Sequence, residues 1–418
     1  MPYTLLKYGL NKNVPFKKHI GLPQPTELKK SYDVVIIGGG SHGIAIAYYL
    51  AKYHGITNVA VLEKAYLGKA NIAYNITTVR SNYLTPEEVK FYAQSLKLFK
   101  RMSHEFDFNM TYSQRGQLTL AHTDAAIRSF RQQAEINQYY GSHSKLIGPK
   151  DIQELVPALN MNPAHKPILA GLWHIDGVTT SHNAVTFGYA KEATKRGVEL
   201  HQLTEVTDII VENGKVTGIN TNRGKVKCGV AVQAVAEYSS LIAEKAGFKV
   251  PVISYPLQAI VSQPMKPLLD PLVSSSALHC YVQQTGHGEI LFGGGYGSYP
   301  PYSTRATLEL KETLLAHAIE MFSFVADLRL LRQWTGVAEM TSDCNPIMGL
   351  SPVENYYLDA GWGTWGFKST PICGKTMAKL IASGGKVPDL IAPFAMDRFH
   401  RLTQVNRNEG KSLRVKTT

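Results

Sequence analysis

The chain has 418 residues, which is enough for two or more lobes around a sizeable core. Hydrophobic residues make up 44% and charged residues 18%, as in an ordinary globular protein, and no stretch has the apolar length of a membrane span. The formal net charge of +12 comes from dispersed basic residues without a recognised nucleic-acid-binding motif, so we expect no nucleic-acid partner; a solvated basic surface or attraction for a carboxylate substrate is the better interpretation.

Residues 1–31 are predicted to form an N-terminal arm. Four prolines interrupt this basic segment, and it lacks the continuous apolar stretch of a secretory signal. Packing on a neighbouring protein and simple disorder are both compatible with such an arm.

The following unit combines a strand, a glycine turn, a helix and a second strand. The β-branched run Val34–Ile37 predicts a strand buried on both faces. Gly38, Gly40 and Gly43 then have the G-x-G-x-x-G spacing, which allows a tight turn, close approach of a pyrophosphate and close packing of helix on strand. The second strand is predicted at Val59–Leu62 and is followed by Glu63, 20 positions after Gly43, where a carboxylate can accept a ribose hydroxyl. This order of parts predicts a dinucleotide site.

The middle of the chain alternates helical and strand patterns. Apolar periodicity predicts helices at 86–106, 125–140, 149–155, 184–196 and 307–322. Strands are predicted at 116–121, in a meander over 206–235 with a tight Asn213-Gly214 turn, as short antiparallel segments between 254 and 299, and at 356–360.

A second glycine loop, GWGTWGFKSTP, follows the strand at 356–360 and opens another helix. Because this loop lies so far from Gly43 in the sequence, we expect a nucleotide domain assembled from both ends of the chain. The predicted fold class is therefore α/β, with a Rossmann-like dinucleotide domain (32–85, 145–250 and 330–400), an inserted antiparallel-sheet substrate domain (86–144 and 251–329), and a C-terminal tail (401–418).

Several side chains have chemistry suited to a site but an ordinary alternative as well. Arg80 and Tyr83 lie in a threonine-rich loop, and an arginine can bind a carboxylate through two parallel hydrogen bonds. From spacing alone, a structural salt-bridge arginine is the better interpretation. His174 and His182 flank the entrance of a helix that Ser181 or Asn183 can cap, where histidines usually serve packing or capping.

The four cysteines are scattered without a C-x-x-C pair. This spacing argues against a zinc cluster and a disulfide scaffold, so we expect no metal site. A reducing cytoplasm is the simplest location.

Several blocks together carry a family resemblance over residues 32–399. They are YDVVIIGGGSHGIAIAYYLAK, TTVRSNYL, GVTTSHNAVTFGYAKEATKRGVELHQLTEV, VTGINTNRG and GWGTWGFKSTP. The chain resembles the glycine-oxidase and D-amino-acid-oxidase group of flavin enzymes, and within it the β subunits of heterotetrameric sarcosine oxidases.

The resemblance implies noncovalent FAD in the Rossmann-like domain and a second flavin, FMN, attached covalently to His182. It implies that Arg80 and Lys368 are the catalytic residues that hold the substrate carboxylate. It further implies alpha, gamma and delta companion subunits, with tetrahydrofolate handled through a partner. The cofactor-binding residues that match are Gly38, Gly40, Gly43, Glu63, His182, Gly361, Gly363 and Gly366.

The chain also departs from the family pattern. Val235-Ala236 stands where relatives usually carry Ala-Gly, and Trp365 replaces a commonly small residue, which predicts a tighter active-site ceiling. Ser181 stands where a basic residue is frequent, which weakens the expected contacts to FMN phosphate. Monomeric relatives link FAD to a cysteine, but Cys344 does not match that position, so we expect an ordinary thiol there.

The function that this resemblance implies is oxidative demethylation of sarcosine to glycine and formaldehyde, with hydrogen peroxide formed through FMN. Two alternatives remain open. One is a related dehydrogenase acting on N-methylglutamate, proline or dimethylglycine with another electron acceptor. The other is a noncatalytic flavoprotein that serves as an assembly subunit.

Overall fold

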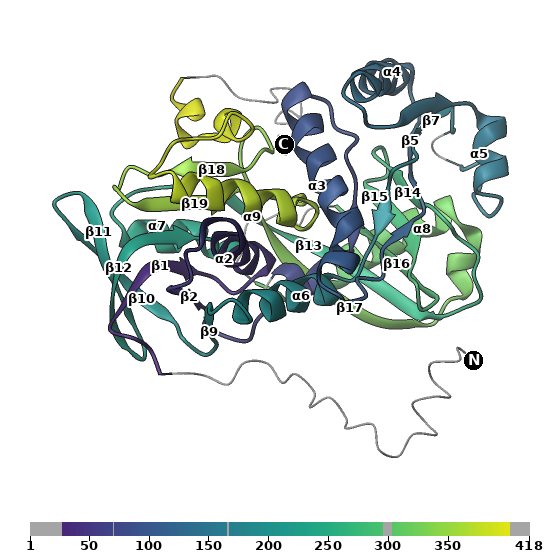
Figure 1. Ribbon diagram of the computed structural model, residues 1–418. Helices are drawn as coiled ribbons and strands as arrows, with labels where there is room; N and C mark the ends of the chain where they lie inside the picture. Colours follow the sequence, from purple (N-terminus) through teal and green to yellow (C-terminus); the bar gives the residue numbers. More distant parts are fainter. Residues whose placement is uncertain (1–26, 70, 165–166, 296–302, 402–418) are drawn as a thin grey trace, which may run out of the picture.

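The computed structural model describes residues 27–69, 71–164, 167–295 and 303–401. Most of the predicted N-terminal arm and C-terminal tail therefore lies outside the described residues. Two lobes, each built on a large sheet, stand side by side, with α3 (Pro86–Glu105) between them (Figure 1).

The first sheet is a mostly parallel sheet with an antiparallel extension. Its strand order is β10-β11-β12-β1-β2-β9, and β19 pairs with both β12 and β18. The neighbours of β1 are parallel, whereas β10, β11 and β12 form the predicted antiparallel meander. Because β19 lies parallel to β12, the C-terminal part of the chain completes a sheet that the N-terminal part begins, as predicted. The strands are β1 (Ser31–Ile37), β2 (Val59–Leu62), β9 (Glu199–His201), β10 (Val206–Glu212), β11 (Lys215–Thr221), β12 (Gly224–Gln233), β18 (Ile347–Leu350) and β19 (Tyr356–Ala360).

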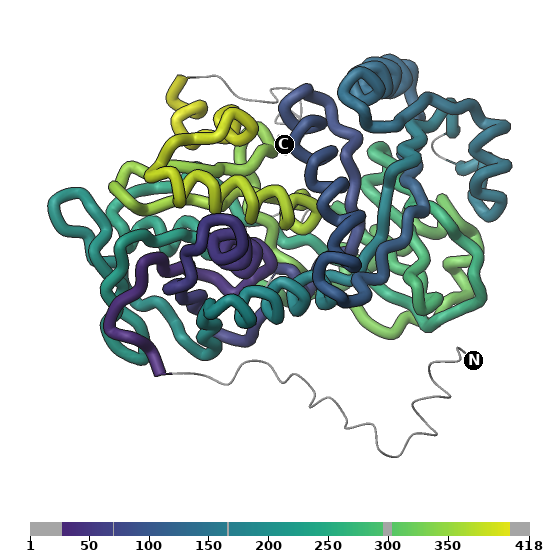
Figure 2. The backbone as a smooth tube through the Cα atoms, in the orientation of Figure 1, coloured from purple at the N-terminus to yellow at the C-terminus, as the bar shows by residue number. Residues whose placement is uncertain are grey.

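Two layers cover this sheet. On one face Val34 and Ile36 join a core formed with α2 (Ser41–His54), α3, α6 (His182–Thr194) and α9 (Gly366–Ala382). On the other face Val35 and Ile37 join a core formed with the meander and α7 (Ser239–Lys245). Alternate side chains of β1 thus enter opposite cores, which is why a continuous apolar run is required. Helices α2 and α9, from opposite ends of the chain, lie against each other (Figure 2).

The second sheet has the order β17-β13-β16-β15-β14-β5-β7-β6, and its pairs are antiparallel except for β14 with β5. Helix α8 (Leu308–Met321) packs on it, with α4 (Asp124–Tyr139) and α5 (Pro149–Leu155) at the β6–β7 end (Figure 1). The strands are β5 (Gln117–Ala121), β6 (Ser144–Ile147), β7 (Ala170–His174), β13 (Ile253–Pro264), β14 (Leu272–Ser275), β15 (Cys280–Gln284), β16 (Glu289–Gly294) and β17 (Leu330–Met340).

The domain boundaries stay a prediction, with one adjustment that the strand pairing supports. Residues 145–250 and 330–400 were predicted to belong to the dinucleotide domain. Nearly all of β6 and all of β7 lie in the first of these segments, and β17 lies in the second, yet all three strands pair within the second sheet. We therefore propose assigning residues 144–174 and 330–340 to the substrate domain.

A small three-stranded sheet lies next in sequence to two of the predicted site residues. Its strands are β3 (Thr78–Val79), β8 (Val178–Thr179) and β4 (Ser113–Gln114). Arg80 directly follows β3, and His182 lies shortly after β8. The remaining short elements are 3₁₀ turns at Asn71–Tyr74, Ala236–Tyr238, Ser323–Asp327, Ala392–Phe394 and Met396–Phe399.

Local chemistry explains the element ends that were predicted. Asn213 and Gly214 have φ of 52° and 78°, the pair of left-handed residues that a tight hairpin turn requires. Helix α3 begins with a capping box between Thr85 and Glu88, within a residue of the predicted start. Within the described ranges, no helix is both long and apolar enough to cross a membrane.

Candidate active site

The three glycines of the first loop have distinct steric roles. Gly38 has φ of 109°, and a Cβ atom there would lie 2.1 Å from the carbonyl oxygen of Ala234. A Cβ atom on Gly43 would lie 2.1 Å from the carbonyl oxygen of Gly38, so the helix could not approach the strand. By contrast, a Cβ atom on Gly40 would meet nothing within 4 Å, because Gly40 faces a cavity. These are the three environments that the G-x-G-x-x-G spacing predicts.

Glu63 lies at the end of β2 and braces this loop. Its carboxylate accepts hydrogen bonds from the amides of Gly39 (2.9 Å) and Ala65 (2.8 Å), and it also lines the cavity. A carboxylate has about four acceptor sites. Capacity therefore remains for the predicted ribose hydroxyl.

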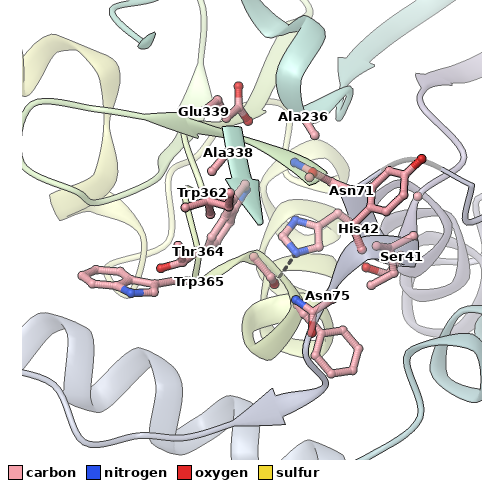
Figure 3. Close-up of a pocket in the computed structure, with 18 of the residues that line it drawn as sticks. Ser41, His42, Asn71, Asn75, Ala236, Ala338, Glu339, Trp362, Thr364 and Trp365 are labelled. Carbon is pink, nitrogen blue, oxygen red and sulfur yellow. Dashed lines mark hydrogen bonds between the residues drawn. The ribbon is translucent and has the colours of Figure 1, made fainter. Parts of the chain in front are cut away.

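The cavity has a volume of about 940 Å³ and is lined by residues of both lobes. Figure 3 shows Ser41 and His42 from the start of α2, Ala338 from β17, and Trp362 and Trp365 from the loop before α9 around it. A cavity of this size, bounded by a helix N-terminus with its free amides, suits a large phosphate-containing cofactor.

Arg80 lines the same cavity in a fixed orientation. Its Nη1 donates to the carbonyl oxygen (2.8 Å) and to Oδ1 (3.0 Å) of Asn82, and the guanidinium lies 4.4 Å from the ring centroid of Tyr83. The Asn82 bonds occupy Nη1 alone. Across the described ranges Arg80 has no ion pair with a carboxylate, so it offers charge and donors to a ligand.

Lys368 lies in the first turn of α9 and also lines the cavity. Its side chain is buried, and Nζ donates to the carbonyl oxygen of Thr364 (3.3 Å). Burial, and then the nearby charge of Arg80, lower the pKa of the Lys368 ammonium well below its usual value. Nor does this lysine form an ion pair with any carboxylate that the structure describes. An anion bound between the two residues would relieve the repulsion.

Aromatic rings pack beside Arg80, which together with Lys368 is called the cationic pair below. Tyr83 stacks on Tyr92 with ring centroids 4.1 Å apart and meets Trp365 edge-on at 4.9 Å. Trp365 is buried and lines the cavity. These buried rings place apolar surface beside Arg80, where the attraction for an anion is stronger than in bulk water. The tighter ceiling at Trp365 stays a prediction.

The second glycine loop contributes two of its three predicted residues to the cavity. Gly363 and Gly366 line it, whereas Gly361 does not. A Cβ atom on Gly361 would instead meet the Thr341 methyl group at 2.7 Å. Gly361 is thus needed for packing within the loop.

His182 is not among the residues that line this cavity. It is the first residue of α6, which Ser181 caps by accepting from the amide of Ala184 (3.2 Å). The His182 side chain is partly buried, its Nδ1 has no hydrogen-bond partner among the described residues, and burial lowers its pKa. A neutral imidazole with an unused ring nitrogen is chemically suited to covalent attachment of a flavin.

Two of the sequence departures lie at left-handed residues. Ala236 has φ of 48° and lines the cavity, which explains why a glycine suits this position. Cys344 has φ of 58° in a buried loop and does not line the cavity. The expectation of an ordinary thiol at Cys344 stays a prediction.

Sequence reasoning missed His42 and Asp359. His42 occupies a variable position of the glycine motif, and Asp359 lies in the predicted strand 356–360. Both line the cavity and are hydrogen-bonded to each other at 2.9 Å. The available signal was one buried acid in an apolar strand, which normally requires a partner.

The glycine loop, the acid that follows β2 and the large cavity that both of them line are the features of a dinucleotide-dependent oxidoreductase. The sequence profile of the FAD dependent oxidoreductase family (DAO) matches residues 33–380. The chain belongs to this family, and FAD is its cofactor.

The comparisons with individual proteins agree. Sarcosine oxidase subunit beta of Arthrobacter sp is 41% identical over 378 residues, which cover 90% of this chain and 92% of that protein. The protein of the same name from Rhizobium meliloti (strain 1021) is 41% identical over 398 residues, covering 95% of each chain. These matches confirm the resemblance seen in the sequence. A solved structure, L-proline dehydrogenase from P. horikoshii, superposes with a TM-score of 0.85 at 31% identity, over 90% of this chain and 100% of that one.

Proposed function

We propose that this chain oxidises a secondary N-methyl amino acid, with sarcosine as the first substrate. The observation that carries the proposal is the cationic pair Arg80 and Lys368, which faces the same cavity as the glycine loop and lacks a carboxylate partner within the described ranges. An amino-acid carboxylate supplies the missing charge, and arginine binds it through parallel hydrogen bonds.

FAD, when bound at the glycine loop, supplies the acceptor for two electrons from the N-methyl carbon. The chain contributes position and electrostatics. Arg80 is already oriented by Asn82, so little entropy is lost when the substrate binds. Lys368 becomes more stable as an ammonium once a carboxylate lies beside it. The oxidised substrate is an imine, which water hydrolyses to glycine and formaldehyde.

We further propose that His182 holds FMN covalently. At this second flavin, the two electrons taken from the substrate would pass to molecular oxygen, which would be reduced with two protons to hydrogen peroxide. The support is the unpartnered Nδ1 of His182, the lowered pKa of its imidazole, and its place in the sequence block SHNAV, which carries the resemblance. The relatives are named as beta subunits. We therefore propose alpha, gamma and delta type companions, with tetrahydrofolate taking up the one-carbon unit on a partner.

A cytoplasmic location is also proposed. Cys228, Cys280, Cys344 and Cys373 are all buried free thiols. Such thiols fit a reducing compartment.

The decisive experiment is anaerobic titration of the purified native complex with sarcosine, following flavin bleaching. We expect stoichiometric reduction in the wild type. Lys368→Met and Arg80→Met should weaken substrate binding by at least tenfold, because each removes a charged hydrogen-bond donor. Lys100→Met, an exposed change on α3, is the matched control. Full bleaching of both variants at wild-type substrate concentrations would refute the role of the pair.

The covalent link is tested separately by acid precipitation. Part of the yellow colour should stay with the denatured wild-type protein, whereas His182→Ala should retain only extractable FAD. Complete extraction of flavin from the wild type would exclude attachment at His182.

A second candidate is a dehydrogenase for L-proline, favoured by the superposition on L-proline dehydrogenase. Proline is also a secondary amine with a carboxylate, so the same cationic pair suits it. Comparing oxygen consumption with dye reduction for sarcosine and proline discriminates the two. Faster proline turnover with dye and without oxygen uptake would favour the dehydrogenase.

A further inference from the structure

His42 is surrounded by hydrogen-bond acceptors. Its Nδ1 lies 2.9 Å from Oδ2 of Asp359, and its Nε2 lies 2.7 Å from the carbonyl oxygen of Gly366. A carbonyl oxygen can only accept, so Nε2 carries a proton. If Asp359 is ionised, Nδ1 carries one as well, and the ring is an imidazolium.

The groups that contact the Asp359 carboxylate are hydrogen-bond donors. Its other oxygen, Oδ1, accepts from Nε1 of Trp362 (2.6 Å) and from the thiol of Cys373 (3.1 Å). Both groups donate, and hydrogen bonds to the charged form of a carboxylate stabilise that form. Asp359 is buried, so it needs a compensating cation. His42 is the cation at hydrogen-bond distance.

The other groups around His42 do not compete for its protons. The hydroxyl of Ser369 lies 3.3 Å from Nε2 but donates its own hydrogen to Gly366. Burial and the Asp359 carboxylate raise the pKa of the Cys373 thiol, which keeps it neutral. Burial by itself would lower the pKa of His42, but the charge and hydrogen bond of Asp359 raise it above its usual value.

The hydrogen bonds of His42 join three segments that meet at the cavity. His42 belongs to the first turn of α2 after the glycine loop, Asp359 is the penultimate residue of β19, and Gly366 begins α9. The ring also meets Trp362 edge-on at 4.8 Å (Figure 3). Lys368 lies in that same first turn of α9. Any movement of Gly366 relative to His42 therefore moves Lys368 relative to the glycine loop.

We propose that His42 is a positioning residue, held as an imidazolium by Asp359, which locks the start of α9 against the glycine loop. This rests on the proposed function in one respect, since the locked element carries the carboxylate-binding Lys368. The imidazole, carboxylate and thiol atoms of His42, Asp359 and Cys373 that could bind a metal ion lie within 4.8 Å of one another. The hydrogen bonds among these three side chains account for that spacing.

The charge of His42 is measured directly on the holoprotein. Histidine-selective ¹⁵N labelling should give, for the wild type, the signals of a ring with both nitrogens protonated at neutral pH. The absence of these signals in His42→Gln assigns them to His42. A ring with a single proton would overturn the proposal. Asp359→Asn, which preserves side-chain volume, should convert this ring to the neutral form, and a ring that stays doubly protonated in that variant would also overturn it.

The positioning role is measured by release of FAD from the holoprotein, followed by its fluorescence. Loss of a charge-assisted hydrogen bond should accelerate release roughly 10-fold to 100-fold in His42→Gln. In the wild type, release should accelerate as pH rises through the raised pKa of His42, because the cation is then lost, whereas the variant should lack this step. His104→Gln, an exposed histidine on α3, is the control.

A His42→Gln variant that releases FAD at the wild-type rate, with the same pH dependence, would overturn the proposal. If His42→Gln fails to fold, Asp359→Asn provides the same two measurements. Neither measurement contains substrate. A complex that ignores sarcosine but passes both tests would therefore refute the proposed substrate and leave the role of His42 intact.

Discussion

The buried His174 should make the protein sensitive to acid. Its side chain is fully buried, and its Nε2 accepts a hydrogen bond from the amide of Ser81 (3.2 Å). On the other side, Nδ1 lies 3.2 Å from the carbonyl oxygen of His143, to which it donates. Protonation would place an N–H group against the Ser81 amide. The ring is therefore required to be neutral in the folded protein.

The magnitude follows from the pKa. Burial, partly opposed by Asp176 and reinforced by Arg80, lowers the pKa of His174 to about 4, against about 6.5 in an unfolded chain. A lowered pKa on a histidine means that its contribution to stability is complete above pH 6.5 and is lost as pH falls toward 4. The free energy of unfolding should fall by about 3 kcal/mol over that interval from this residue alone.

The assay is urea unfolding of the holoprotein between pH 7.5 and pH 4, comparing the wild type with His174→Gln. The glutamine oxygen can still accept from Ser81 but does not titrate. The variant should be less stable at pH 7.5 because it packs less well, and the difference should shrink by about 3 kcal/mol at pH 4. His104→Gln should leave the pH profile unchanged. A difference that stays constant with pH would refute the reasoning.

Three further predictions concern stability and cofactor retention. Gly40→Ala should keep the thermal unfolding midpoint of the wild type but lose FAD affinity, because its Cβ enters the cavity. Gly43→Ala should instead unfold at a lower temperature, because its Cβ meets the backbone of Gly38. Flavin content and thermal unfolding scans distinguish the two variants, and equal effects would contradict the steric assignment. Arg398→Leu removes the guanidinium that donates to both carboxylate oxygens of the buried Asp343 and should cost about 3–5 kcal/mol in urea unfolding, with a loss under 1 kcal/mol counting against it. Ala236→Gly should stabilise the protein by about 0.5–1 kcal/mol, since it removes a left-handed alanine; destabilisation would show that the strain is absent.

The parts predicted from sequence were those fixed by short-range chemistry. The unit from Val34 to Glu63 could be predicted because strand, turn, helix and acid follow one another within a short stretch, each with its own residue requirement. The turn at Asn213 and Gly214 is equally local. The glycine loops were found in the same way, whereas the spacing around Arg80 favoured a structural salt bridge and only the family resemblance marked it as a site residue.

The parts that were missed depend on contacts between distant segments. His42 and Asp359 are 317 positions apart, and the sequence around neither residue predicts that the two side chains are hydrogen-bonded. Strand β17 was not predicted because it lacks the alternation of a half-buried strand: its first five residues are exposed or partly exposed and its last six are buried. Strand β13 is longer than the short strands expected there. Register and pairing are decided by the partner strand, which the local sequence does not specify.

The two proposed flavin positions differ in the chemistry that the chain provides. The cavity presents charge and directed donors, namely Arg80, Lys368 and the amides at the start of α2, which suit a phosphate-bearing cofactor and an anionic substrate held without covalent bonds. His182 instead presents a neutral ring nitrogen without a partner among the described residues. Because α6 packs against α2, the helix that begins at His182 contacts the helix that begins at the glycine loop. A change that loosens this helix pair should therefore disturb both positions together, whereas changes at Arg80 should disturb the cavity alone.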